Sequence, residues 1–154
     1  MASKLPDVAE VFSDLVRCET RLYNAVGERL QEEHGLTTAQ FEFLRHLRRH
    51  PGARVADLAG VFAIGVGAVS KGVDRLERRG WVARQSNPDD RRSSILALTP
   101  TGQRLVDGAE ETFARRLHEL IGGAVDGPGA AALATALAAL RATLERDRVG
   151  LPAG

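Results

Sequence analysis

Residues 68–102, AVSKGVDRLERRGWVARQSNPDDRRSSILALTPTG, constrain the fold more than any other stretch of the chain. A basic helical pattern runs up to Gly80, and two short strand patterns, 81–85 and 94–98, follow it around the polar loop SNPDDRRS. A helix followed directly by an arginine-tipped hairpin can place the helix in one groove of DNA and the loop in the groove beside it. The stretch therefore points to a nucleic-acid partner.

The residues before this stretch complete a helix-turn-helix pattern. A helix is predicted over 37–50, where a Thr-x-x-Gln capping box opens an amphipathic segment that ends at a Pro-Gly pair. Two further helices are predicted at 55–62 and 66–79, joined by a short turn at 63–65. Two helices joined by such a turn, the second of them basic, are typical of a helix-turn-helix.

Long helical patterns flank this central unit on both sides. One runs from Asp7 to about Glu33, a second from the Thr99-Pro100 start to about Ile121, and a last, Ala-rich one over 129–147 after the break VDGPG. The apolar stripe of the first comprises Val8, Phe12, Leu15, Cys18, Leu22, Val26 and Leu30, and that of the second comprises Leu105, Phe113, Leu117 and Leu120.

The flanking helices carry more apolar surface than one small central unit can cover, so we expect a homodimer built from them. The predicted fold class is mainly α with a small β-hairpin wing: a winged helix-turn-helix core flanked by N- and C-terminal dimerisation helices. We expect a single domain over 1–154, with dimerisation helices at about 7–33 and 100–147 and the winged helix-turn-helix at about 37–99.

The charge of the chain is concentrated in one segment. Seven basic residues against four acidic ones leave residues 71–92 at +3, and since the whole chain carries +1, the remainder carries −2. A basic segment on a slightly acidic body favours a localised contact with a polyanion. A solvated charged face gives the same pattern, and charge alone does not separate the two.

Composition favours a globular protein, with 44% hydrophobic and 27% charged residues. Pro6 and Asp7 come too early for the apolar core of a signal peptide, and the apolar run 130–140 is too short to span a bilayer. The single cysteine excludes an intramolecular disulfide, which fits a reducing compartment. We expect a cytoplasmic protein without a membrane partner.

The chain resembles the MarR family of winged helix-turn-helix transcriptional regulators, with clear motifs from about Leu36 to Gln103. The resemblance implies a homodimer that binds double-stranded DNA at a near-palindromic operator, most often as a repressor. It often implies release by a small aromatic or lipophilic effector or by an oxidant. The motifs are, in order, LTTAQFEFLRHL (36–47), VADLAGVF (55–62), VSKGVDRLERRGWVAR (69–84), DRR (90–92) and LTPTG (98–102).

The resemblance maps the recognition helix onto Val66–Arg79, with its N-terminal half facing base edges. There Ser70 and Lys71 can bond bases or phosphates, and apolar side chains can touch thymine methyl groups. Gly65 and Gly67 stand where members often carry polar side chains, so that specificity leans more on the wing and on DNA shape. The DNA-contacting residues expected on this helix are Val66, Gly67, Ala68, Ser70, Lys71 and Arg75.

The wing tip spans Asn87–Arg92. A planar guanidinium in a narrow minor groove meets an enhanced negative potential, so arginine suits this position. By the family's Asp-x-Arg pattern, Asp90 orients Arg92, which enters the groove, and Arg91 lies on the flanking phosphates.

Two alternative functions stay open. One is a winged-helix protein-interaction module without specific DNA binding, which the two glycines favour and Arg92 argues against. The other is a thiol-based oxidant-sensing repressor acting through Cys18. Sensors of that kind resemble a low-pKa thiol held by tyrosines, whereas here the only tyrosine is Tyr23 and Cys18 lies in an apolar stripe. A thiol in that setting stays inert, so a structural role is favoured.

The remaining candidates favour structural roles. His46 and His50 have the spacing of metal ligands, but the run RHLRRH disfavours a dication, so no metal site is predicted. Trp81 is expected to anchor the wing, and Arg84 to pair with Asp89 or Asp90 or to meet a phosphate. His34 and His118 are isolated and favour surface or dimer packing.

No catalytic or cofactor motif is present. The sequence has no nucleophile elbow and no phosphate-binding glycine loop, so we expect neither an enzyme nor a cofactor. An effector pocket would lie between the DNA-binding unit and the dimer helices, with contributions from 7–33, 37–50 and 100–121. No set of residues identifies its ligand.

Overall fold

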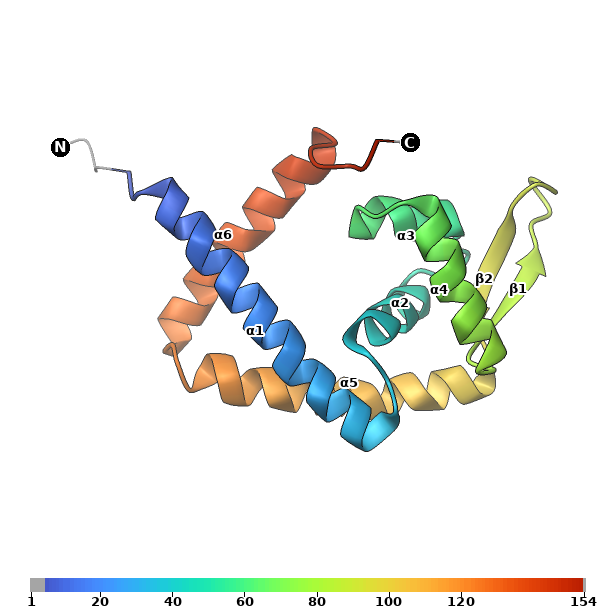
Figure 1. The fold of residues 1–154 in the computed structure, drawn as a ribbon, viewed down its shortest axis with the longest axis horizontal. Coiled ribbons are helices and arrows are strands. Elements are labelled where there is room, and N and C mark those ends of the chain that lie inside the picture. Colours follow the sequence, from blue (N-terminus) through green and yellow to red (C-terminus); the bar gives the residue numbers. More distant parts are fainter. Residues whose placement is uncertain (1–4, 154) are drawn as a thin grey trace.

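The computed structural model describes residues 5–153, so that residues 1–4 and 154 of the predicted domain lie outside the described part (Figure 1). The predicted fold class is confirmed, and every helix and strand lies within two residues of its predicted bounds. The elements are α1 (Val8–His34), α2 (Thr38–Arg49), α3 (Val55–Phe62), α4 (Val66–Arg78), β1 (Val82–Ser86), β2 (Ser94–Leu98), α5 (Pro100–Gly122) and α6 (Gly127–Arg146).

Side-chain caps determine where the helices begin. The predicted capping box of α2 is present, with Thr37 Oγ1 accepting from the Gln40 amide at 3.1 Å. Thr99 caps α5 in the same way and is followed by Pro100. The segment VDGPG was expected only to break the chain, but Asp126 caps α6 by accepting from the Gly129 amide at 2.7 Å. The last helix therefore starts two residues earlier than predicted.

The core lies where α2, α3, α4 and the hairpin meet the inner parts of α1 and α5. Its fully buried side chains include Phe41 of α2, Leu58 of α3 and Val73 of α4. On α5 the predicted face is offset, because the buried positions are Gly102, Val106, Ala109 and Thr112, while Leu105, Phe113, Leu117 and Leu120 are half-buried. Small residues on α5 allow α1 to lie close against it.

The outer part of α1 (residues 8–21) and the whole of α6 lie outside this core (Figure 1). Of the predicted α1 stripe only Val26 and Leu30 are buried, whereas Phe12 is 66% exposed. No residue of α6 is buried, and Leu140 on it is 48% exposed. Within residues 5–153, no single helix is long and apolar enough to cross a membrane.

Candidate nucleic-acid interface

The predicted recognition helix, α4, is held by one apolar face. Val69, Val73 and Leu76 are fully buried at three- and four-residue spacing, so the opposite face is turned to solvent. Gly65 caps α4 without a side-chain hydrogen bond, which leaves the first amides of the helix open to an external acceptor.

The DNA-contacting residues predicted on α4 all reach the surface. Val66 is 57% exposed, which suits apolar contact with a base edge. Lys71 and Arg75 are exposed one turn apart and form no salt bridge with any residue between 5 and 153. The remaining predicted positions are Gly67 and Ala68, which are exposed, and Ser70, which is half-buried.

The hairpin is antiparallel, with Val82 opposite Leu98 and Ser86 opposite Ser94. Trp81, just before β1, is buried beneath the Arg79 guanidinium, whose carbon lies 4.3 Å from the centre of the indole ring. This confirms Trp81 as the anchor of the wing. At the same end of the hairpin, the Thr99 hydroxyl donates to the Gly80 carbonyl at 2.6 Å.

The wing loop is closed by its own side chains. The nearly buried Asn87 accepts from the Asp89 amide at 3.0 Å and donates to Ser93 Oγ at 3.2 Å. Asp90 Oδ1 accepts from the backbone amide of Arg92 at 2.9 Å. Asp90 therefore contacts Arg92 through the backbone, which turns the chain so that Arg91 and Arg92 are exposed.

Arg84 braces the hairpin against α4, which corrects the prediction for this residue. Its Nη1 lies 2.7 Å from Asp74 Oδ1 and 3.1 Å from Glu77 Oε1, rather than near the acids of the wing loop. Hydrogen bonding to Asp74 raises the pKa of the guanidinium above its ordinary value, so it stays charged. The spacing 74, 77 places both acids on one face of α4, and this signal could have identified the brace.

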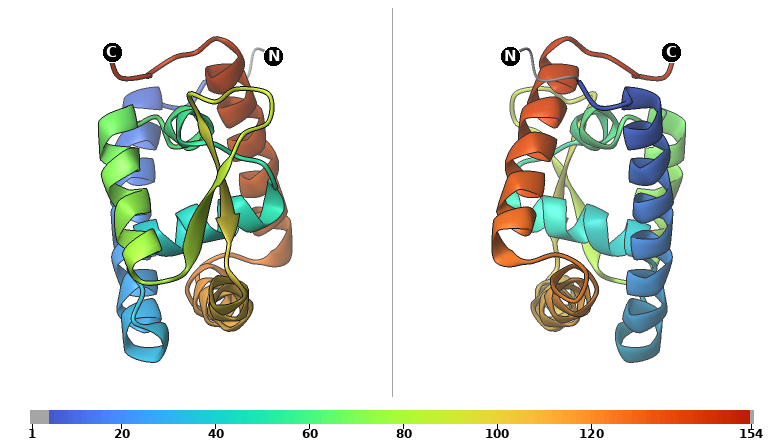
Figure 2. Two further views of the ribbon diagram at one scale, coloured as in Figure 1. Left: turned by 90° about the vertical axis from the view of Figure 1, so that its right-hand side faces the viewer. Right: turned by 90° about the vertical axis from the view of Figure 1, so that its left-hand side faces the viewer.

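These contacts bring α4 and the hairpin together on one side of the molecule. The left view of Figure 2 shows this side, with α4 next to the two strands and the wing loop beyond them. The two elements that carry the basic residues of segment 71–92 therefore lie next to each other.

The other candidates lie away from this surface. Cys18 is exposed in the single chain rather than buried in an apolar stripe. His46 and His50 stack with ring centres 4.1 Å apart, and residues 5–153 contain no cluster of three potential metal ligands. His118 is exposed, whereas His34 bonds Thr112 of α5.

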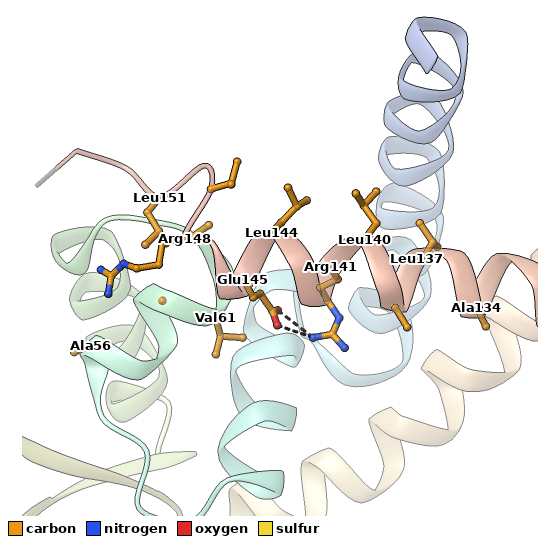
Figure 3. Close-up of a pocket in the computed structure, with 14 residues that line it drawn as sticks. Ala56, Val61, Ala134, Leu137, Leu140, Arg141, Leu144, Glu145, Arg148 and Leu151 are labelled. Atoms are coloured by element: carbon orange, nitrogen blue, oxygen red, sulfur yellow. Dashed lines mark hydrogen bonds and ion pairs between the residues drawn. The ribbon is translucent and has the colours of Figure 1, made fainter. Parts of the chain in front are cut away.

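A hollow runs between α6 on one side and α2 and α3 on the other (Figure 3). A wide apolar part of about 950 Å³ has Val61 of α3 on one wall and Leu137 and Leu144 of α6 on the other. A second part of about 730 Å³ borders α2 at Arg45, His46, Arg49 and His50. The effector pocket was expected to involve helices 7–33, 37–50 and 100–121, but of these only α2 lines the hollow, together with α3 and α6.

Comparisons with known proteins establish the family. The sequence profile of the MarR family matches residues 36–94. The HTH-type transcriptional repressor NicR of Pseudomonas putida is 32% identical over 120 residues, which cover 78% of this chain and 75% of NicR. The chain belongs to the MarR family. The multiple antibiotic resistance protein MarR of Escherichia coli is 26% identical over 75% of this chain and 84% of its own length.

The fold agrees with this assignment. The repressor CouR bound to a 23-mer DNA duplex is similar with a TM-score of 0.78 and 28% identity, over 91% of this chain and 99% of CouR. MarR-family proteins are transcriptional regulators, so this chain is a DNA-binding regulator rather than an enzyme.

Proposed function

We propose that the protein is a homodimeric repressor that binds a near-palindromic operator in the cytoplasm. The observation that carries the proposal is the surface shared by α4 and the wing, on which exposed cations stand beside an uncapped helix N-terminus. A basic helix and an arginine-tipped loop on one face suit adjacent grooves of a duplex.

Each part of the surface has a proposed role. Ser70 and Lys71 contact bases or phosphates, Val66 and Ala68 contact thymine methyl groups, and the Gly67 backbone approaches the groove. Arg75 and Arg91 neutralise phosphates. Arg92 enters the minor groove from the loop that Asp90 shapes.

The proposed dimer joins the outer parts of α1 and α6 of two copies. Support comes from the apolar side chains that these helices leave exposed, together with the apolar groove between α3 and α6 (Figure 3). Exposed apolar surface of this extent on elongated helices is typical of an interface. Two copies joined in this way would place two recognition helices about one DNA turn apart.

A small aromatic or lipophilic anion is the proposed effector, bound at the α2 end of the hollow. Arg45, Arg49 and Arg141 border this end, and the stacked rings of His46 and His50 form a flat wall beside Phe62. An anion with a flat ring would stack on the imidazoles and pair with the arginines in place of Glu110 and Glu145, which are their present partners.

Selection of bound duplexes from a random-sequence library tests the proposed function. We expect a near-palindromic operator to be enriched, and binding to it to weaken steeply with salt as counterions are released. No enriched sequence together with a flat salt dependence would favour the protein-interaction module instead. Release by peroxide that Cys18→Ser abolishes would favour the oxidant sensor.

A further inference from the structure

A short chain of polar contacts joins the end of α1 to the middle of α5. The Thr112 hydroxyl, on a residue only 3% exposed, donates to Glu33 Oε2 at 2.7 Å and lies 2.8 Å from His34 Nε2. Since its one proton goes to Glu33, the hydroxyl accepts from His34, which must carry a proton on Nε2. Arg115, one turn along α5, donates to both Glu33 oxygens at 3.2 and 3.0 Å.

These contacts determine how α5 lies along α1. Gly108 faces the imidazole, and a Cβ there would lie 3.2 Å from His34 Cε1, so the helices are close. Apolar packing of buried side chains, such as Leu30 of α1 and Val106 of α5, tolerates small shifts, whereas hydrogen bonds depend on direction and distance. A slip of one residue along α5 would move Thr112 by about 1.5 Å and turn it by about 100°, which breaks both of its hydrogen bonds.

The cluster lies where α1 crosses α5 (Figure 1). On one side of the crossing, the outer parts of α1 and α5 continue toward α6. On the other side, α1 leads into α2 through Gly35, and α5 follows directly from β2. The angle between α1 and α5 therefore sets the orientation of the proposed DNA-binding unit, α2 to β2, relative to the proposed dimer helices.

We infer that Thr112, together with Glu33 and His34, is a positioning group that sets the angle of the DNA-binding unit and thereby the half-site spacing that the dimer accepts. The inference rests on the proposed homodimeric function. Adding one base pair moves a half-site by about 3.4 Å along the duplex and by about 35° around it, so a fixed angle between α1 and α5 favours one spacing.

The test compares two variants of the full-length protein. Thr112→Val keeps the shape of the side chain and removes the hydroxyl, whereas Thr112→Ser keeps the hydroxyl and removes a methyl group. Each is measured against the operator selected with the wild type, and against operators with one or two base pairs added or removed between the half-sites. The oligomeric state is determined by sedimentation in the same buffer.

The wild type and T112S should favour one spacing by about tenfold or more, as large as the cost of a mismatched base pair. T112V should remain dimeric, and its affinities should differ by less than about threefold between spacings. A general loss of stability would instead lower affinity equally at every spacing.

An unchanged spacing preference in dimeric T112V overturns the inference and leaves the proposed function intact. Failure of the wild type to bind any selected operator overturns the proposed function itself. If T112V does not fold, Glu33→Ala, which removes a carboxylate that is 34% exposed, decides in the same assay, and an unchanged preference again overturns the inference.

Discussion

Arg84 and Asp74 join the wing to the recognition helix through an ion pair of 2.7 Å. Glu77 contacts the same guanidinium and also accepts from the Arg84 backbone amide at 3.3 Å. Both acids lie on the helix proposed to face DNA, where unpaired carboxylates would repel phosphates. The brace therefore holds the wing and offsets part of the unfavourable charge of the two acids.

Arg84→Met, which keeps the aliphatic stem, should lower the free energy of unfolding by about 1 kcal/mol. It should weaken operator binding most strongly at low salt, because two carboxylates are then left unpaired near phosphates. Chemical denaturation and binding titrations at two salt concentrations measure these effects. Arg104→Met, at an exposed arginine whose one side-chain hydrogen bond within residues 5–153 goes to Thr101, is the matched control. Equal affinity of R84M and the wild type at low salt would contradict the electrostatic role of the brace.

Arg92→Ala should weaken operator binding by about 1–3 kcal/mol and relax sequence preference beneath the wing if the guanidinium reads the minor groove. Arg91→Ala should instead weaken binding uniformly across sequences and reduce the salt slope by about 1. Titrations of both variants on the selected operator and on an unrelated duplex separate these roles. If Arg92→Ala binds both duplexes like the wild type, the wing does not read DNA.

Gly102→Ala should destabilise the fold by about 3 kcal/mol or more. A methyl group there would overlap the Trp81 carbonyl oxygen, and Trp81 Cα would lie only 3.2 Å away. This corner joins the hairpin to α5, so relief requires the backbone itself to shift. Gly122→Ala, where a Cβ meets nothing within 4 Å, is the control, and thermal unfolding of both variants decides. A Gly102→Ala variant as stable as the control would contradict the close approach of Gly102 to the Trp81 backbone.

Protonation of His46 should lower the free energy of unfolding as the pH drops below neutrality. Burial, followed by the neighbouring His50, lowers the pKa of His46 from its ordinary value of 6.5. The unfolded chain therefore binds the proton more readily, so the contribution of His46 is complete above the ordinary pKa and is lost as the pH falls toward the lower folded pKa. His46→Gln should flatten denaturation midpoints between about pH 7.5 and 5.5. Parallel curves for variant and wild type would exclude His46 as the cause.

Leu140→Asp should convert the proposed dimer into a monomer, because it places a charge in the exposed apolar stripe of α6. A monomer contacts a single half-site, so its operator affinity should fall by about 100-fold or more. Ala142→Asp, on the opposite face of α6 by helical periodicity, carries the same charge and should remain dimeric. Sedimentation of the two variants tests the assignment of the interface. A dimeric L140D would contradict it.

The bounds of the helices and strands could be predicted closely because several local signals agree for each element. The capping box at Thr37, the Thr99-Pro100 start and the buried spacing of Val69 and Val73 each follow from short-range chemistry. The start of α6 was misplaced because the proline and the two glycines of VDGPG suggest a break, while the capping role of Asp126 is the stronger local effect. Periodicity also does not show that, within one chain, no other element buries the apolar side chains of the outer part of α1.

The site was less predictable than the fold. The exposed positions of α4 follow from its apolar face, and the spacing of Asp74 and Glu77 indicates two acids on one face of this helix. That Arg84 is their partner depends on how closely the hairpin approaches α4, which is decided by tertiary packing. The cluster around Thr112 was missed for the same reason. Its members are separated by 78 and 79 residues along the chain, and a lone threonine in a helix carries no signal of its own.

The hydrogen bonds of Asn87 and Asp90 have a thermodynamic consequence for association. Ordering a flexible backbone costs about 1–2 kcal/mol per residue, and a loop already tied into turns has lost most of that freedom before it meets its partner. What remains to be restricted is mainly the rotamer freedom of Arg91 and Arg92. The loop therefore meets the duplex as a preformed platform, and the strength of the contact depends on two mobile arms rather than on the folding of the loop.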